Sequence, residues 1–237
     1  MLPRLILGLA LGVLAQQAGA QTYQRIFDGV SLKGWHQTGK GSWTVVDSVL
    51  IGTMATGNPE GYLISDLTAK DFSLRLKFMW AKGNSGINFR NEQKGDLAMG
   101  IQVDLEGGGT SGCLYDNVKG AYVAKSDSIA KWYKANEWND LLLDAKGTKI
   151  MVSLNGKKTV EYTDVGGRSE GVFAFQFHVG QVMDVRFKDI EMLDYTKPVS
   201  LADPARPRSR RISSGRAGYG HVVLPAEDRE VNGKRVR

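Results

Sequence analysis

The chain has 237 residues, of which 42% are hydrophobic and 24% are charged, with a formal net charge of +6. This composition is typical of one globular domain with appendages, and it excludes a fibre or a wholly disordered chain. The positive charge lies mainly at the C-terminal end, where residues 198–237 hold nine Lys or Arg and four Asp or Glu. Because Arg4 supplies one further charge, residues 21–197 carry no net charge, and the basic balance describes the tail and not the domain.

The first twenty residues have the pattern of a signal peptide. Arg4 precedes the apolar run 5–15, and Ala18-Gly19-Ala20 matches a cleavage site between small residues. The run is too short for a membrane span, and no Cys follows it as in a bacterial lipoprotein. We therefore expect export to the periplasm or the exterior, with an uncleaved anchor as the alternative. Cys113 is the only Cys and is expected to be a small buried residue.

The stretch 22–194 alternates between strand patterns and turn signals. The first hairpin is expected in 43–52, with its turn at Asp47-Ser48. Residues 72–80 alternate strictly between apolar and polar and predict a half-buried strand. Further hairpin turns are predicted at Lys146-Gly147 and Asn155-Gly156. Two long strands follow in 171–179 and 182–193, and one short helix is expected within 126–136.

Together these elements predict an all-β fold. About a dozen short strands, 29 Gly and no sustained helical period favour a two-sheet antiparallel jelly-roll sandwich over residues 21–196. Beyond it, residues 197–237 are rich in Pro, Gly, Ser and Arg and are expected to form a basic flexible tail. The tail is either a solvated extension or contacts an acidic surface, and the export signal argues against nucleic acid as its partner.

Three strand patterns place unusual polar residues on one face. Asn, Gln, Asp, His and Arg make directional hydrogen bonds, whereas a solvated strand face usually carries Lys, Thr and Glu. If the strands lie side by side, their polar faces form a concave wall suited to sugar hydroxyls. The alternative is that each face merely contacts water. The residues concerned are Asn88 and Arg90, then Gln102, Asp104 and Glu106, and finally Gln176 and His178.

Metal and cofactor motifs are sparse in this sequence. It contains no phosphate-binding Gly loop, dinucleotide fingerprint, nucleophile elbow or zinc helix. With three His in the chain, a site built from several His is not expected. His178 with Asp104 or Glu106 could hold a divalent cation through oxygen ligands, and no other cofactor is implied.

The ordered motifs resemble a known family. They span roughly 24–194 and read "FDGVSLKGW", "WTVVDSVLIG", "FSLRLKF", "NSGINFR", "IQVD", "SGCLYD", "EWND", "VSLNGKKTVEY", "GVFAFQFH" and "VRFKDI". The set resembles the 3-keto-disaccharide hydrolase domain family, which implies a concanavalin-A-like jelly roll. The family's polar positions fall on Asn84, Arg90, Gln102, Gln176 and His178, with Tyr115 beside them. Gly100 occupies the position of the family's usual Glu, and Lys188 that of an Arg.

The resemblance implies cleavage of glycosides oxidised to a ketone at C3, by removal of the C2 proton, elimination and hydration. His178, Asp104 or Glu106 would be the base, and Arg90 would hold the enolate oxygen. The expected substrate-binding residues are Asn84, Asn88, Gln102, Tyr115, Gln176 and Lys188. The alternatives are a glycosidase using Asp104 and Glu106 as its two carboxylates, a carbohydrate-binding module without catalysis, and an interaction module that the tail tethers to an acidic surface.

Overall fold

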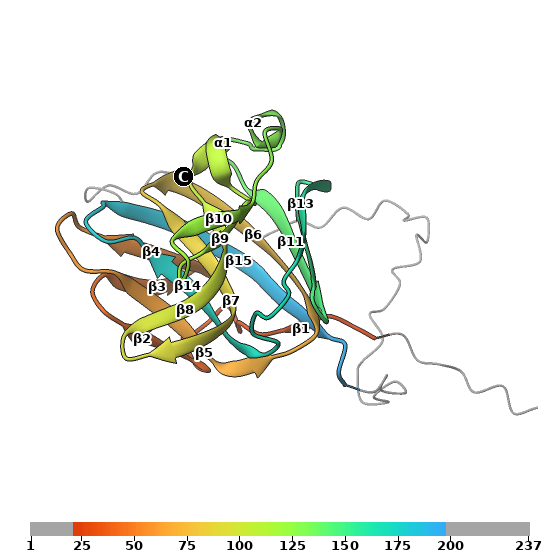
Figure 1. Cartoon of the computed structure of the whole chain (residues 1–237). Coiled ribbons are helices and arrows are strands. Elements are labelled where there is room, and N and C mark those ends of the chain that lie inside the picture. Colours follow the sequence, from red (N-terminus) through yellow and green to blue (C-terminus); the bar gives the residue numbers. More distant parts are fainter. Residues whose placement is uncertain (1–20, 198–237) are drawn as a thin grey trace, which may run out of the picture. The chain divides into compact units, whose positions relative to one another are not determined.

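The structure is a computed structural model that describes residues 21–197. The expected signal peptide, and the tail from residue 198 onward, lie outside these residues. Two antiparallel sheets pack face to face, as the alternating patterns predicted (Figure 1). None of the helices in the described residues has the length and apolar character needed to cross a membrane.

Sheet A has eight strands. Seven lie in the order β13-β12-β11-β6-β15-β4-β3, and β1 pairs with β15 beside this path. The central pair, β6 and β15, holds the longest strands of the sheet. The bounds are β1 (Gln24–Arg25), β3 (Ser42–Val46), β4 (Val49–Met54), β6 (Phe72–Lys82), β11 (Asn139–Lys146), β12 (Lys149–Leu154), β13 (Lys157–Thr163) and β15 (Met183–Asp194).

Sheet B has seven strands in the order β10-β9-β8-β7-β14-β5-β2. The three strands that carry the sequence-predicted polar faces, β7, β8 and β14, are neighbours at its centre, so the side-by-side arrangement that the polar pattern required is present. The bounds are β2 (Trp35–Thr38), β5 (Gly61–Ala69), β7 (Ser85–Lys94), β8 (Leu97–Leu105), β9 (Leu114–Asp116), β10 (Ala121–Ala124) and β14 (Gly171–Phe177).

Two short helices lie together at one end of the sandwich (Figure 1). The second, α2 (Ile129–Trp132), falls inside the segment 126–136 where one short helix was expected. The first, α1 (Gly107–Thr110), was not expected, because a run of Gly has low helix propensity. It follows directly after β8.

Two of the three predicted hairpin turns form where the sequence placed them, and the third is shifted by one residue. Asp47 and Ser48 both have positive φ, 49° and 63°, as a two-residue turn between twisted strands requires. Asn155 and Gly156 do the same with φ of 50° and 75°. The turn after β11 begins at Gly147, one residue later than Lys146-Gly147 predicted, because Lys146 still pairs with Lys149.

The space between the sheets is filled by aromatic and aliphatic side chains. Phe173, Phe175 and Phe177 of β14 are each no more than 2% exposed. The ring of Trp43 from sheet A stacks on Phe177 with a centroid distance of 4.3 Å. Cys113 is buried, as expected for a lone Cys. Because these rings face inward, the residues between them must face outward, and this sets the polar face of sheet B.

Candidate functional site

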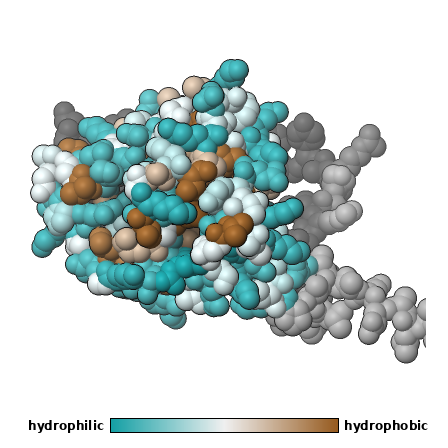
Figure 2. All heavy atoms as spheres, viewed as in Figure 1, coloured by the Kyte–Doolittle hydropathy of each residue, from teal (hydrophilic) through white to brown (hydrophobic). Residues whose placement is uncertain are grey.

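The outer face of sheet B carries a connected set of polar side chains. Ile87, Val103 and Phe175 point into the core, so their neighbours along β7, β8 and β14 point outward. We call this set the polar wall. Its members are Asn84, Asn88, Gln102, Asp104, Tyr115, Tyr122, Gln176 and His178. Viewed as in Figure 1, the molecular surface is mostly hydrophilic with a few hydrophobic side chains near its centre (Figure 2).

Strand register brings the wall residues into rows. Gln102 lies opposite Asn88 on one side and Tyr115 on the other. Asp104 lies opposite Gly86 in the next row. Directly paired residues of one face have Cβ atoms about 5 Å apart, so each row acts as one continuous surface. The polar residues of separate strands are therefore neighbours in space.

Asp104 is the buried anion of the wall. It is 2% exposed. Tyr122 donates its hydroxyl proton to Oδ2 at 2.8 Å, and Asn84 donates from Nδ2 to Oδ1 at 3.3 Å. Loss of hydration, together with the charge of Glu106, raises the pKa of the Asp104 carboxyl, and the neighbouring hydroxyl and amide donors offset only part of that rise. A carboxyl in this setting exchanges protons at a higher pH than one in water.

Two wall amides have acceptors without a protein donor. The Nε2 of Gln176 donates to Glu60, and this contact determines the orientation of the amide because its oxygen would repel the carboxylate. The Oε1 of Gln176 then receives no hydrogen bond from the described residues, and neither does Oε1 of Gln102. Both residues are at least 96% buried. A buried acceptor without a donor is costly, so a hydrogen-bond donor that reached either oxygen would recover free energy.

His178 lies half-buried at the end of β14. Its backbone N–H donates to the carbonyl of Asn84 at 3.3 Å, which places it beside that wall residue. Its Nδ1 lies 3.0 Å from the carbonyl oxygen of Val179, an atom that can only accept, and 3.3 Å from the amide nitrogen of Gln181. The shorter contact favours the tautomer with its proton on Nδ1. Nε2 is then the unprotonated nitrogen of the neutral ring and can act as a base.

Arg90 does not belong to the wall, and the expectation that Asn88 and Arg90 share a face is wrong. The register of β7 against β8 shifts between Phe89 and Glu92, and Arg90 has a φ of 52°. This β-bulge breaks the period of two. The guanidinium donates to the carbonyl oxygens of Lys70 and Gly147 and to the carboxylate of Asp71. Its contacts hold the rim of the sandwich together and do not support a substrate-facing role.

Two other expected site residues lie apart from the wall. Glu106 follows the end of β8 and is exposed, so it does not continue the outward row of Gln102 and Asp104. Lys188 lies on β15 of sheet A, with its ammonium 4.0 Å from the ring centre of Trp138. Its expected substrate-binding role is therefore contradicted by its position on the other sheet.

The tip of the β7–β8 hairpin folds over part of the outer face. Thr38 donates to the carbonyl oxygen of Asp96 at 2.6 Å, and a nitrogen of His36 lies 3.0 Å from Oε1 of Gln93. Beneath the tip lies a second small hydrophobic cluster. Its buried members are Tyr62, Ile64, Ala98 and Ala174. This end of the face is closed, and the more exposed wall residues are at the other end, where Asn84 and His178 are half-buried beside the buried Asp104.

Gly100, the position of the family's usual Glu, is part of this bend. Its φ of 152° is one that L side chains rarely adopt. A Cβ added there would lie 2.4 Å from Oδ1 of Asn91. Asn117 holds the bend by accepting from the N–H of Gly100 at 2.7 Å and donating to the carbonyl of Ala98 at 2.8 Å. A larger residue at this position requires a different local backbone.

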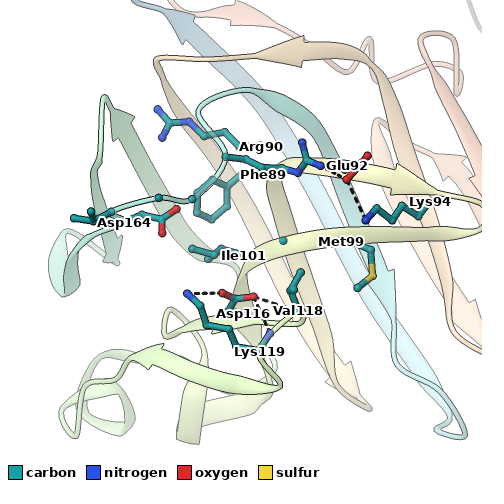
Figure 3. A pocket seen from close by; sticks show the side chains of 15 residues that line it. Phe89, Arg90, Glu92, Lys94, Met99, Ile101, Asp116, Val118, Lys119 and Asp164 are labelled. Atoms are coloured by element: carbon teal, nitrogen blue, oxygen red, sulfur yellow. Dashed lines mark hydrogen bonds and ion pairs between the residues drawn. The ribbon is translucent and has the colours of Figure 1, made fainter.

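A separate groove lies where the bent hairpin approaches the segment after β13 (Figure 3). It has a volume of about 460 Å³. Its lining combines apolar side chains of the hairpin, such as Met99 and Ile101, with charged residues that include Asp116 and Asp164. None of the catalytic or substrate-binding residues expected from the sequence lines this groove except Arg90.

Three wall-associated residues were not predicted from the sequence: Tyr122, Tyr62 and Glu60. Tyr122 lies on the short strand β10 and reaches Asp104 only because β10 and β8 both flank β9. Glu60 accepts from Tyr62 at 2.8 Å and from Gln176, although its own strand begins one residue later. No local pattern marks these residues, since strand order alone brings them to the wall.

No metal cluster is formed by the wall in the described structure. Among residues 21–197, no group of three or more His, Cys, Asp or Glu has the arrangement that could hold a metal ion. The expected pairing of His178 with Asp104 or Glu106 thus gains no third ligand of these types within that range.

The fold is shared with several solved structures of low sequence identity. A protein from Bacillus subtilis with a galectin-like fold superposes with a TM-score of 0.58 at 12% identity, covering 74% of this chain and 98% of that one. A candidate glycosyl hydrolase from Parabacteroides distasonis gives 0.53 at 18% identity, covering 73% and 93%. The carbohydrate-binding module CBM66 from Bacillus subtilis gives 0.52 at 16% identity, covering 68% and 96%.

Family membership rests on the sequence itself. No curated protein matches the chain. The family model of the 3-keto-alpha-glucoside-1,2-lyase-like domain matches residues 22–193, which include both sheets apart from the last residue of β15. This match agrees with the resemblance that the ordered motifs indicated. The chain therefore belongs to the 3-keto-alpha-glucoside-1,2-lyase-like domain family.

Proposed function

We propose that the polar wall binds a glycoside oxidised to a ketone at C3 and cleaves its glycosidic bond by elimination. The observation that carries this proposal is the combination of a buried carboxylate with two buried amide oxygens that lack donors. Asp104 and Gln102 lie on β8 and Gln176 on β14, with β7 between these strands. A sugar ring supplies several hydroxyl donors at such spacing. The half-buried His178 follows the end of β14 and borders this surface.

The chemistry follows from the ketone. A carbonyl at C3 acidifies the proton on C2, and Nε2 of His178 removes that proton to form an enolate. The electron pair then forms the C1–C2 double bond as the C1–O bond breaks. The leaving oxygen takes the proton that His178 removed from C2 and departs as the second sugar, and water adds to C1 in a later step. Each step conserves charge and atoms, and the base needs to be accessible and neutral.

Asn84 takes the role that the sequence had suggested for Arg90. Its Nδ2 carries two protons, one of which is donated to Asp104. The other is available for the enolate oxygen, and the buried Asp104 holds the amide in place. Preorganised neutral donors stabilise a developing oxyanion without reorganisation. Asp104 is thus assigned as the group that orients the donors Asn84 and Tyr122.

A carbohydrate-binding module without catalysis is the second candidate. Gly100 replaces the family's usual Glu, and the local backbone there does not accept a side chain. The fold also superposes on CBM66, which is a carbohydrate-binding module. In this reading the same wall binds sugar, and the unpartnered amide oxygens provide affinity instead of positioning for reaction.

The two candidates separate in one assay. The purified protein is incubated with a 3-keto-disaccharide and with its unoxidised parent, and released sugar is followed by chromatography with and without a chelator. Turnover of the ketone alone, reduced at least tenfold by His178→Ala and by Asp104→Asn but not by Lys188→Ala on sheet A, supports elimination. If calorimetry shows binding of either sugar and no sugar is released, the catalytic proposal is wrong and the carbohydrate-binding module is favoured. Turnover that His178→Ala leaves unchanged shows that the base is elsewhere.

A further inference from the structure

In the groove under the bent hairpin, every lining cation has an anionic partner, but one lining anion has no cationic partner among the described residues. Its lining cations all have anionic partners: Lys119 lies 2.9 Å from Asp116, and Lys94 and Arg168 both contact Glu92. Arg90, the remaining lining cation, contacts Asp71. The lining anion without such a partner is Asp164. Figure 3 shows its carboxylate entering the groove from the side opposite Lys94 and Met99.

Asp164 is buried without a local hydrogen bond. The residue is 8% exposed, and its carboxylate forms no hydrogen bond or ion pair with another residue of the stretch 21–197. Burial raises the pKa of Asp164; the charge of Lys119 offsets part of this rise, and the charges of Asp116 and Arg90 have smaller, opposite effects. Burying a carboxylate without a partner is unfavourable, so a cation delivered by a ligand recovers free energy here.

The rest of the groove favours a ligand with an apolar part. Val118 and Val165 stand at its mouth with exposed fractions of 65% and 83%, and Phe89, Met99 and Ile101 line it. A volume of about 460 Å³ lies within the range of small-molecule sites. Apolar walls beside one unpaired carboxylate match a compact molecule that carries a single positive charge.

We propose that this groove is a binding site for a protonated primary amine on a compact body, with Asp164 as its anionic anchor. The ammonium donates hydrogen bonds to the Asp164 carboxylate, and the body of the ligand contacts Val118, Val165 and Met99. Such amines occur as amino sugars and as alkylamines. The site is separate from the polar wall, and it stands or falls independently of the proposed cleavage reaction.

Calorimetric titration of the full chain with glucosamine and with n-butylamine tests this proposal, with glucose and N-acetylglucosamine as uncharged counterparts. We expect at least one amine to bind and both uncharged sugars to bind at least tenfold more weakly. Asp164→Asn should abolish amine binding, whereas Asp140→Asn removes the same charge from sheet A and should leave it unchanged. Tighter binding of glucosamine than of n-butylamine would show that the site is suited to amino sugars, and tighter binding of n-butylamine would show that it is suited to alkylamines.

Two further readouts keep the test decisive. Because Asp164→Asn removes an unpaired buried charge, it should fold with an unchanged or higher Tm and leave any sugar binding or turnover at the polar wall at the wild-type level. In NMR spectra, the backbone amide chemical shifts that change on adding the amine should be those of residues 164–168 and 116–119. Equal binding of glucose and glucosamine, binding that survives Asp164→Asn, or no binding by either amine at millimolar concentration overturns the proposal.

Discussion

The hydroxyl of Tyr122 on β10 donates a 2.8 Å hydrogen bond to Oδ2 of Asp104 on β8, although β9 lies between these two strands. The contact ties the edge of sheet B to its buried carboxylate. Tyr122 also packs edge-on against Tyr115, with ring centres 5.1 Å apart. The edge strand thereby closes one side of the polar wall and supplies a donor that no strand pattern in the sequence predicts.

Removing the Tyr122 hydroxyl should reduce the sugar affinity or the turnover of the polar wall. A hydrogen bond to a charged group contributes about 1.5–3 kcal/mol, so Tyr122→Phe is expected to lower turnover or sugar affinity by roughly 10- to 100-fold. The measurement is the rate of sugar release, or the Kd by calorimetry if the protein only binds. Tyr23→Phe is the matched control, because its hydroxyl bonds Ser73 of sheet A. An equal loss in both variants would contradict the assignment.

Gly86 gives Gln102 room to lie across the wall. A Cβ at Gly86 would approach Cδ of Gln102 to 2.6 Å. Gly86→Ala should displace this amide and weaken sugar binding about tenfold, the effect of losing one neutral hydrogen bond of roughly 1.4 kcal/mol. Gly109→Ala has no atom within 4 Å of the new methyl and should leave affinity unchanged. Unaltered binding by Gly86→Ala would show that Gln102 does not contact the sugar.

Placing the family's usual Glu at position 100 should not increase activity. Gly100→Glu introduces a side chain at a φ of 152° and against Asn91, and we expect a loss of roughly 1–3 kcal/mol in the free energy of unfolding. Urea denaturation checks this value, and the turnover assay checks the function. A stable Gly100→Glu variant with increased turnover would show that the hairpin bend adapts readily to a larger residue.

The pH dependence of stability should report on Asp104. Burial raises the pKa of its carboxyl above the ordinary value, so the folded state binds a proton more tightly than the unfolded state does. Stability from this group is therefore greatest below the ordinary Asp pKa and falls as pH rises through the raised pKa. Wild type should gain stability relative to Asp104→Asn on acidification across that window in urea titrations. A pH-independent difference would contradict the raised pKa.

The tip of the β7–β8 hairpin should become more mobile when its hydrogen bond to Thr38 is removed. Thr38→Val keeps the shape of the side chain but removes the 2.6 Å hydrogen bond to the carbonyl of Asp96, which costs about 1 kcal/mol. Hydrogen exchange should accelerate in residues 93–98 and remain unchanged in the turn at Asn155-Gly156. Faster exchange at both places would indicate global destabilisation in place of local opening.

Local patterns were sufficient for the fold and for most of the wall. The alternation in β8 and β14 correctly placed Gln102, Asp104 and Gln176 opposite the core, because the period of two holds along a regular strand. The same rule failed at Arg90, where a bulge inserts an extra residue and reverses the face. It also failed at Glu106, since the strand ends at Leu105 before the pattern does.

The sequence by itself determined the strands, the two-residue turns, the family and the polar residues of regular strands, because these depend on neighbours along the chain. Only the tertiary structure decided that Tyr122 reaches Asp104, that Lys188 lies on the opposite sheet, and that Asp164 stands unpaired in a groove. Strand order and bulges set these contacts, and both depend on packing between segments distant in sequence. A chemical group's neighbours across a sheet therefore cannot be inferred from its own strand.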